Sequence, residues 1–203
     1  KKVLIIGAGN SACDVAVEVS RVSKHVTLST RSPQWFVPKF MFGKPTDQLA
    51  TGFQWLPSKF RQWILETLLL KLQGKNSQYG LPNPDWTPFE AHPTMNQDVL
   101  PLIRHGRIQT RPAIQSLDGT DVIFVDGQRQ AFDIIVAATG YWISFPFFDP
   151  EFINFKHEKQ VPLYHKMLHA EHKNLFFIGL FQPLGCIWPL ADYQAMLACR
   201  EIL

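Results

Sequence analysis

An α/β fold built on a doubly wound parallel sheet is predicted by three features of the sequence. Continuous apolar runs at 3–6 and 134–138 are typical of strands buried on both faces of such a sheet. The first run leads through a glycine-rich turn into residues 11–21, where valines recur at helical spacing. A second strand is predicted at 25–30 and completes a strand–helix–strand unit. Together these features indicate a Rossmann-like domain.

The residues after the second strand interrupt this pattern and are interpreted as a large insertion at about 33–94. Prolines recur through it and break any long periodicity. One amphipathic helix is expected at 58–72, with an apolar face formed by Phe60, Ile64, Leu68 and Leu72. The regular alternation of strands and helices is expected to resume only after this insertion.

A β-meander is predicted after the insertion. A helix at 96–104 is expected to end at Gly106, and three short strands follow, at 107–110, 113–117 and 121–125. Asp126 and Gly127 indicate a type I′ hairpin turn, because both central positions of that turn need a positive φ. The buried strand at 134–138 comes next. A further buried strand at 175–178 and a closing helix at 190–203 form a C-terminal strand–helix segment.

Composition excludes several classes of protein. The 203 residues are 46% hydrophobic and 18% charged, which is ordinary for a globular chain of one large or two small domains. The net charge of +3, without clustered lysine and arginine, argues against nucleic-acid binding. The cysteines form no CxxC pair and the histidines no ligand array, so we expect no metal site and a reducing, cytoplasmic compartment. No apolar run is long enough to span a membrane.

The glycine-rich turn fits a dinucleotide-binding motif. Gly7, Gly9 and Ala12 fill the three positions of G-x-G-x-x-[G/A]. In that motif the first glycine makes the tight turn, the second lets the pyrophosphate approach the backbone, and the third small residue lets the helix pack on the sheet. The pyrophosphate sits at the helix N-terminus, on free N–H groups. Because the motif lies between a strand and a helix, the sequence predicts a dinucleotide site here.

The end of the second strand indicates which dinucleotide binds. NAD and FAD sites have an acidic residue there for the ribose hydroxyls, but this strand ends in LSTRS. Arg31 occupies the position, and a guanidinium pairs well with a 2′-phosphate. Ser29, Thr30 and Ser32 could add hydroxyl donors. We therefore favour NADP over NAD, with a merely solvent-exposed arginine as the alternative.

Several other residues have a structural reading beside a functional one. Asp14 is expected in the first turn of the helix, where helix-end electrostatics explains it without a catalytic role. Cys13 is expected to be packed rather than reactive. Residues 136–141, VAATGY, and Gln182 could approach a ligand or simply end a strand and fill a loop. The aromatic insertion could line an apolar substrate channel, touch a membrane, or form a core cluster or domain interface.

Four stretches together resemble a known family. VLIIGAGNSACDVA, LSTRS, DIIVAATGY and NLFFIGLFQPLGCIWPLADYQA are similar to the second half of flavin-containing monooxygenases. That flavin-dependent group also includes Baeyer–Villiger and N-hydroxylating monooxygenases. The resemblance covers nearly the whole chain, and the insertion is its least specific part.

The resemblance implies that the chain is a fragment. Enzymes of this family carry an FAD motif first, then an FxGxxxHxxx(Y/W) fingerprint, then the NADPH motif, and this chain starts on the NADPH motif. Residues 1–141 would be the NADPH domain with its insertion, and 142–203 a strand–helix segment that completes the FAD domain. The missing partner would be the N-terminal FAD-binding half. The isolated chain is then expected to be inactive and prone to aggregate.

The family's activity implies the cofactors and the site. NADPH reduces FAD, and the reduced flavin uses O2 to oxygenate a soft nucleophile (N or S) or a ketone in a small apolar or nucleophilic substrate. The flavin supplies this chemistry, so no protein acid or base is assigned. The implied cofactor-binding residues are Gly7, Gly9, Asn10, Ser11 and Ala12 at the pyrophosphate, Arg31 and Ser32 at the 2′-phosphate, Thr139 and Gly140 near the nucleotide, and Gln182 with the loop after it near the flavin. Peripheral membrane contact is compatible with this reading but not required.

Three alternatives stay open. Another flavoprotein with two dinucleotide sites, such as a disulfide reductase, would share the motif, although the QPLG stretch and the insertion argue against it. A non-catalytic NADP-binding module would bind NADPH without flavin. A simple Rossmann dehydrogenase would need a Tyr-x-x-x-Lys pair or a catalytic histidine array, and the sequence shows neither.

Overall fold

The computed structural model describes residues 1–52, 55–155, 161–183 and 186–203. The chain divides into two compact units, Lys1–Gly140 and Tyr141–Leu203. Each unit has an apolar core of its own, so each is a folded body that can be considered by itself.

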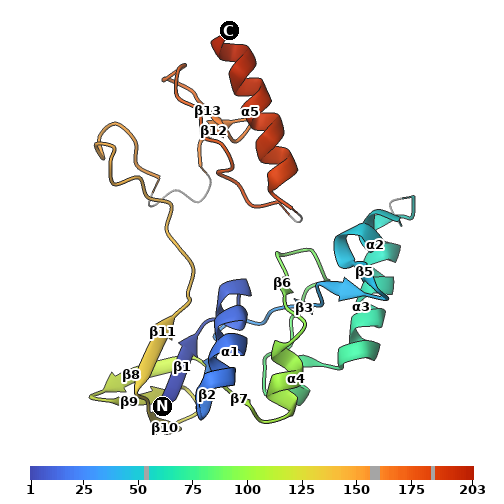
Figure 1. Cartoon of the computed structure of the whole chain (residues 1–203), viewed down its shortest axis with the longest axis vertical. Coiled ribbons are helices and arrows are strands. Elements are labelled where there is room, and N and C mark those ends of the chain that lie inside the picture. Colours follow the sequence, from blue (N-terminus) through green and yellow to red (C-terminus); the bar gives the residue numbers. More distant parts are fainter. Residues whose placement is uncertain (53–54, 156–160, 184–185) are drawn as a thin grey trace. The chain divides into compact units, whose positions relative to one another are not determined.

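A four-stranded parallel sheet forms the centre of the first unit (Figure 1). Its strands are β1 (Lys2–Ile6), β2 (His25–Ser29), β7 (Ile108–Arg111) and β11 (Ile134–Ala137), in the spatial order β11-β1-β2-β7. Ile6 at the end of β1 lies opposite Ser29 of β2 and Ala137 of β11. The carboxyl ends of the strands therefore meet at one edge of the sheet. The α/β fold class and these four strands are confirmed.

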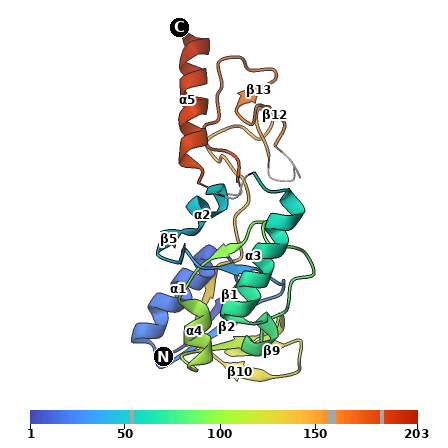
Figure 2. The same ribbon diagram turned by 90° about the vertical axis from the view of Figure 1, so that its right-hand side faces the viewer.

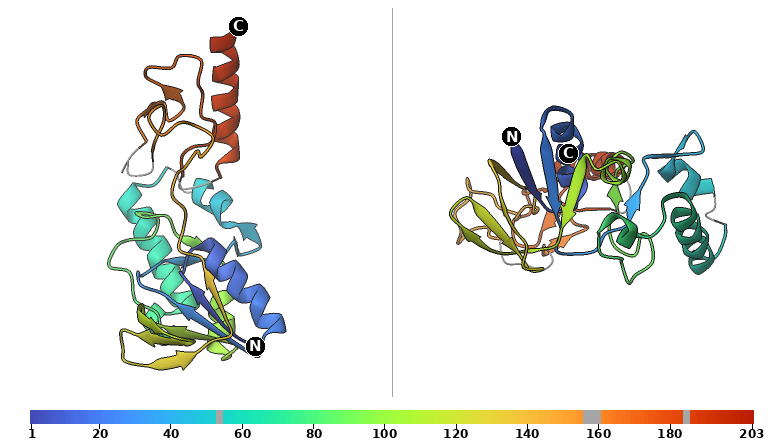
Figure 3. Two further views of the ribbon diagram at one scale, coloured as in Figure 1. Left: turned by 90° about the vertical axis from the view of Figure 1, so that its left-hand side faces the viewer. Right: turned by 90° about the horizontal axis from the view of Figure 1, so that it is seen from below.

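Helix α1 and a β-meander cover opposite faces of this sheet (Figure 3). Helix α1 (Asn10–Val22) packs on Val3 and Ile5 of β1. The meander consists of β8 (Ile114–Asp118), β9 (Asp121–Phe124) and β10 (Arg129–Ala131). The strand expected at 107–110 is β7 of the parallel sheet instead, and β10 was not predicted. Its Phe124 packs with Leu4, because successive side chains of a strand point to opposite faces. β1 thus has an apolar layer on both faces, which explains its uninterrupted apolar run.

The turn between β9 and β10 differs from the expected type I′ turn. Gly127 has a φ of 78°, but Asp126 is not among the described non-glycine residues with a positive φ. The Gly127 N–H donates to the Phe124 carbonyl, and the Phe124 N–H donates to the Gln128 carbonyl, both at 2.9 Å. This pattern is a type I turn followed by a left-handed glycine. Asp126 avoids the left-handed region, and its Oδ1 accepts the Gln128 N–H at 3.1 Å.

The insertion contains more regular structure than its prolines indicated (Figure 2). Its elements are β3 (Phe36–Val37), β4 (Phe40–Met41), β5 (Lys44–Pro45), α2 (Thr46–Gly52), α3 (Ser58–Gln73), the 3-10 helix η1 (Asn76–Tyr79) and β6 (Thr94–Met95). β3 and β6 pair in parallel near the two ends of the insertion. The insertion is therefore closed at its base by a pair of short strands.

The helix expected at 58–72 is confirmed as α3, but its buried face was partly wrong. Phe60 and Leu72 are 47% and 53% exposed, whereas Leu69 is 2% exposed. Leu65, one helical turn before Leu69, and the adjacent Leu68 pack in the same cluster as Leu69. Leu65, Leu68 and Leu69 stand at i, i+3 and i+4 and therefore form one buried face of the helix. Among the described residues, Leu68 is the one member of the predicted face that joins this cluster.

The helix expected at 96–104 is shorter at its start and is α4 (Val99–Arg104). Asn96 Oδ1 accepts the N–H groups of Asp98 and Val99, at 2.9 and 2.8 Å. An asparagine that satisfies free N–H groups in this way lies before the helix rather than in it. The expected end at Gly106 is confirmed by a φ of 74° at that glycine.

Strand β11 was expected to be buried, and this was wrong. Ile134 and Ile135 are 40% and 44% exposed. β11 pairs with β1 on one side, and on its other side no strand pairs with it among the described residues. It is an edge strand of this sheet.

The second unit holds two short strands and one long helix (Figure 1). β12 (Leu163–Tyr164) pairs with β13 (Leu168–His169), and α5 (Trp188–Ile202) confirms the closing helix. The strand expected at 175–178 is wrong, since only Phe176 forms a β-bridge, to Leu168. A parallel strand needs neighbours along its length, and the described part of this unit offers none. No helix among the described residues is long and apolar enough to cross a membrane.

Candidate functional site

The loops that follow the four parallel strands meet at one edge of the sheet. The Gly7 N–H donates to the Ser29 carbonyl and the Ala138 N–H to the Ile6 carbonyl, both at 2.9 Å. The Thr30 N–H donates to the Arg111 carbonyl at 3.0 Å. In open α/β sheets, ligands bind in the crevice outside the carboxyl ends of the strands. This edge is therefore the candidate site.

Gly7 and Gly9 serve the loop in different ways. Gly7 has a φ of 122°, and a Cβ at this position would collide with the Ala138 carbonyl oxygen. The turn and the neighbouring strand thus require glycine at residue 7. A Cβ on Gly9 would meet no atom within 4 Å, and its φ is −76°. Packing within the chain does not explain Gly9, whereas close approach of a ligand to the backbone does.

The start of α1 presents backbone donors without a protein cap. Gly9 is its N-cap residue, and no side chain of the described residues caps the helix. The first turn contains no acidic residue, so its free N–H groups and positive dipole end are not neutralised there. Ser11 is exposed, and Ala12 is fully buried against the sheet. Asn10 Oδ1 accepts the Met95 N–H at 2.6 Å, so the polar group that Asn10 has left is its amide donor.

Asp14 lies beyond the first turn of α1, and the expectation that placed it in the first turn was wrong. The helix begins at Asn10, one residue earlier than expected. Asp14 Oδ1 accepts a hydrogen bond from Asn96 Nδ2 at 2.9 Å and lies 3.7 Å from Lys39 Nζ. Its role is to join α1 to the insertion, which explains its charge without catalysis.

Arg31 and Ser32 lie directly after β2, at the same edge, and both are exposed. Within the described part of the chain, the Arg31 guanidinium makes no hydrogen bond or ion pair. Ser29 and Thr30 are buried, and their hydroxyls donate to the carbonyls of Pro112 and Ser32, at 2.7 and 3.0 Å. These two hydroxyls are already used, so the idea that they donate to a phosphate is not supported.

Arg111 is a second cation at this edge that the sequence did not reveal. It ends β7 and lies opposite Ser29 in the sheet register. Its Nε is buried and has no hydrogen-bond partner among the described residues. A buried guanidinium nitrogen without a partner calls for an acceptor such as an anion. The sequence shows Arg111 as a basic residue at the end of a strand, but its place at the site follows only from the pairing of β2 with β7.

Thr139 and Gly140 follow β11 and are exposed at the end of the first unit. The Ala138–Ile6 hydrogen bond holds the start of this segment next to β1. Gln182 is exposed in the second unit, and residues 184 and 185 of the loop after it lie outside the described residues. Of the predicted site residues, those of the first unit are thus gathered along the carboxyl edge of one sheet.

Cys13 is packed under the loop, as expected. Its thiol is free and buried, and its Sγ lies 3.7 Å from the Ala8 carbonyl oxygen. Burial, with a smaller contribution from the Asp14 charge, raises the pKa of Cys13 to about 12. The thiolate is therefore scarce near neutral pH, and Cys13 is a poor nucleophile there.

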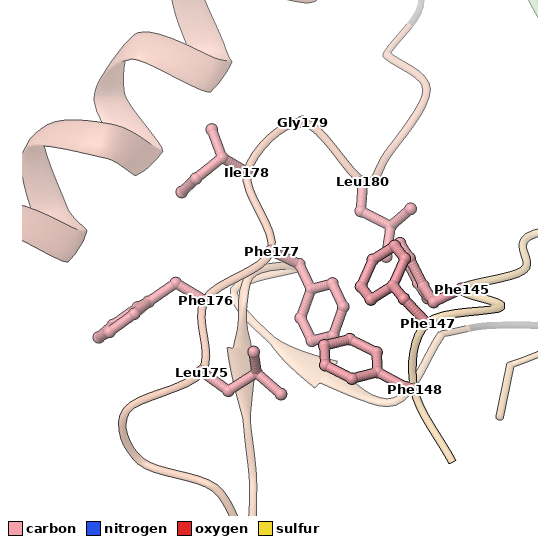
Figure 4. A pocket seen from close by; sticks show the side chains of 9 residues that line it. All are labelled: Phe145, Phe147, Phe148, Leu175, Phe176, Phe177, Ile178, Gly179 and Leu180. Carbon is pink, nitrogen blue, oxygen red and sulfur yellow. The ribbon is translucent and has the colours of Figure 1, made fainter. Parts of the chain in front are cut away.

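The second unit contains an apolar cavity of about 350 Å³ (Figure 4). The side chains of the residues that line it are all apolar: Phe145, Phe147, Phe148, Leu175, Phe176, Phe177, Ile178, Gly179 and Leu180. The rings of Phe145 and Phe177 lie 5.3 Å apart, whereas the Phe176 ring points away from them. Without a titratable lining residue, this cavity offers no acid or base.

Comparison with known proteins identifies the family. The family model described as flavin-binding monooxygenase-like matches residues 1–203. The chain belongs to this family. Dimethylaniline monooxygenase (N-oxide-forming) 2 of Rattus norvegicus is 34% identical over 210 residues, which cover 98% of this chain and 39% of the relative. The resemblance inferred from the four sequence stretches is confirmed.

Solved structures of flavin monooxygenases share the fold. The flavin-containing monooxygenase from Stenotrophomonas maltophilia has a TM-score of 0.55 at 14% identity, covering 99% of this chain and 49% of the other. OTEMO in complex with FAD and NADP has a TM-score of 0.53 at 14% identity, covering 69% and 38%. The chain thus spans less than half the length of these relatives and neighbours.

Proposed function

We propose that this chain is the NADPH-binding part of a flavin-dependent monooxygenase. The whole enzyme would use NADPH, FAD and O2 to oxygenate a soft nucleophile (N or S) or a ketone in a small apolar or nucleophilic substrate. The observation that carries the proposal is the glycine loop at Gly7–Gly9, which leads into the uncapped start of α1. Beside it lie Arg31 and Arg111, whose buried Nε has no hydrogen-bond partner among the described residues. These features lie at one sheet edge of a chain that belongs to the flavin-binding monooxygenase-like family.

The residues present fit an NADP nucleotide. The pyrophosphate would be held by the backbone of Gly7 to Ala12 at the start of α1, where donors and dipole favour an anion. The 2′-phosphate would be held by Arg31 and Arg111, with Ser32 beside them, since one guanidinium group can donate two hydrogen bonds to a phosphate at once. No acidic side chain follows β2 to prefer a bare ribose.

The remaining site residues would act at the junction with the flavin. When bound, FAD would supply the oxygen chemistry, while this chain binds and orients the nucleotide and excludes water. Thr139 and Gly140 would lie along the nucleotide, and Gln182 would approach the flavin. Residues 1–141 would be the NADPH domain with the insertion at about 33–94, and 142–203 would complete the FAD domain.

The proposed partner is an N-terminal FAD-binding half outside this sequence. The chain spans 39% of the rat relative, so most of that protein has no counterpart here. Large apolar side chains of the second unit are exposed, among them Tyr141, Trp142, Trp188 and Tyr193. Surface of this kind is typical of an interface that is covered in the whole molecule.

The free cysteines and the exposed aromatic side chains bear on the compartment and on membrane contact. All three cysteines are free thiols, which supports a reducing compartment such as the cytoplasm. In the insertion, Trp55 and Trp63 are exposed, and Trp63 stacks on Phe60 with ring centroids 5.7 Å apart. Such aromatic side chains suit peripheral contact with a membrane surface, without any spanning helix.

Calorimetric titration with NADPH and NADH tests the 2′-phosphate assignment. We expect wild type to prefer NADPH, and Arg31→Ala or Arg111→Ala to reduce that preference by about ten- to a hundredfold, the value of one charged hydrogen-bond contact. Arg21→Ala, which removes an exposed charge paired with Glu18 on α1, is the matched control and should leave the preference unchanged. An unchanged NADPH/NADH ratio in both site variants would overturn the assignment.

A further inference from the structure

Three consecutive residues at the end of the insertion bond to the glycine loop and helix α1. Thr94 Oγ1 donates to the Ala8 carbonyl oxygen at 2.7 Å. The Met95 N–H donates to Asn10 Oδ1 at 2.6 Å, and Asn96 Nδ2 donates to Asp14 Oδ1 at 2.9 Å. A segment more than 80 residues away in the sequence thus holds two residues of the nucleotide-binding motif, Ala8 and Asn10, and one residue of the helix after it, Asp14.

This segment is itself rigidly held. The Thr94 N–H donates to the Trp35 carbonyl at 2.8 Å, and the Asn96 N–H donates to the Val37 carbonyl at 3.0 Å. Thr94 and Asn96 are 2% and 4% exposed. Asn96 also accepts the first N–H groups of α4. The donors that reach the loop are therefore fixed by β3 on one side and α4 on the other.

The bond from Thr94 fixes the direction of a donor in the loop. The Ala8 carbonyl and the Gly9 N–H belong to one planar trans peptide and point in opposite directions. Holding the Ala8 oxygen toward Thr94 therefore holds the Gly9 N–H away from it. Within the described part of the chain, no atom lies within 4 Å of a Cβ built on Gly9, so the loop is open at this residue.

We infer that Thr94 is a positioning residue for nucleotide binding, which orients the Ala8–Gly9 peptide so that the Gly9 N–H faces the pyrophosphate. This rests on the proposed function. Thr94 does not contact the nucleotide, because it is buried and its hydroxyl already donates to Ala8. The Met95 N–H supports the same loop by donating to Asn10 Oδ1, which leaves Asn10 Nδ2 as the polar group that this side chain can offer to a ligand.

The test is the dissociation constant of NADPH and of NADH for the 203-residue chain, by calorimetry. Thr94→Val keeps the shape and removes the donor, and we expect both constants to rise about tenfold, with their ratio unchanged. Thr94→Ser keeps the donor and should stay within about twofold of wild type. Thr94→Ala removes the hydroxyl a second way, in case the valine variant fails to fold.

The matched control is Thr46→Val. Thr46 is also a buried threonine of the first unit, and its hydroxyl donates to the Pro38 carbonyl. This variant should lose comparable stability and keep both dissociation constants. Unchanged affinity in Thr94→Val and Thr94→Ala, or an equal loss in Thr46→Val, would overturn the inference. A wild-type chain that binds neither nucleotide would instead overturn the proposed function and this inference with it.

Discussion

Substitution by alanine should lower the stability of the chain at Gly7 but weaken nucleotide binding at Gly9. At Gly7, φ is 122° and the new Cβ would collide with the Ala138 carbonyl oxygen. Backbone strain of this kind costs roughly 1–3 kcal/mol, and the displaced strand end adds to it, so we expect Gly7→Ala to lose about 2–4 kcal/mol of unfolding free energy.

At Gly9, the backbone already suits an L-residue and the new Cβ meets no protein atom within 4 Å. Alanine lowers the entropy of the unfolded chain but is a poorer N-cap than glycine, so the net change should stay within about 1 kcal/mol. The same Cβ would stand where the pyrophosphate approaches the backbone. We therefore expect Gly9→Ala to keep stability and to weaken NADPH binding about tenfold or more.

Urea unfolding followed by circular dichroism, with NADPH calorimetry on the same samples, separates the two effects. A Gly9→Ala variant that binds NADPH as wild type does would refute the reasoning about the loop. So would a Gly7→Ala variant of unchanged stability, because the clash with Ala138 would then be absent.

Three further predictions follow from the described contacts. Burial raises the pKa of Cys13 from about 9 to about 12, so its contribution to stability is fully present below pH 9 and is lost as the pH rises toward 12. The free energy of unfolding should fall in this range by up to about 1.4 kcal/mol per pH unit. Urea melts of wild type and Cys13→Ala at several pH values check this, and an equal dependence of unfolding free energy on pH in both proteins would contradict it. Leu69→Ala in α3 should lower the free energy of unfolding by about 2–5 kcal/mol, and Phe60→Ala by less than about 1 kcal/mol, because Leu69 is buried and Phe60 is exposed. Thermal melts in which Phe60→Ala is the less stable variant would show that the opposite face of α3 is buried. The exposed apolar surface of the second unit predicts self-association of the isolated chain in light scattering, and a monodisperse chain that melts cooperatively would count against that surface being an interface.

Local patterns predicted the strand–helix–strand unit and the glycine motif well, because both are set by residues close in sequence. β1, α1 and β2 follow from the apolar periods, and Ala12 is buried where the motif places a small residue. The turn at Asp126 was wrong, because the hairpin loop is longer than the two residues of a type I′ turn and needs a positive φ at Gly127 but not at Asp126.

Features that depend on spatial neighbours were missed. Arg111 can be assigned to the site only once β7 is known to lie beside β2. Thr94 carries no motif, and its role depends on a contact 86 residues away. The strand at 175–178 did not form because an apolar run becomes a parallel strand only beside suitable neighbours.

Titration of the chain with NADPH and, separately, with FAD tests the central claim most directly. The sequence contains one G-x-G-x-x-[G/A] motif, and the strand after it ends at Arg31 rather than at an acidic residue. We predict that NADPH binds and FAD does not, with a circular dichroism melt showing that the sample is folded. A folded chain that binds FAD but not NADPH would contradict the claim that this is the NADPH-binding part of a monooxygenase.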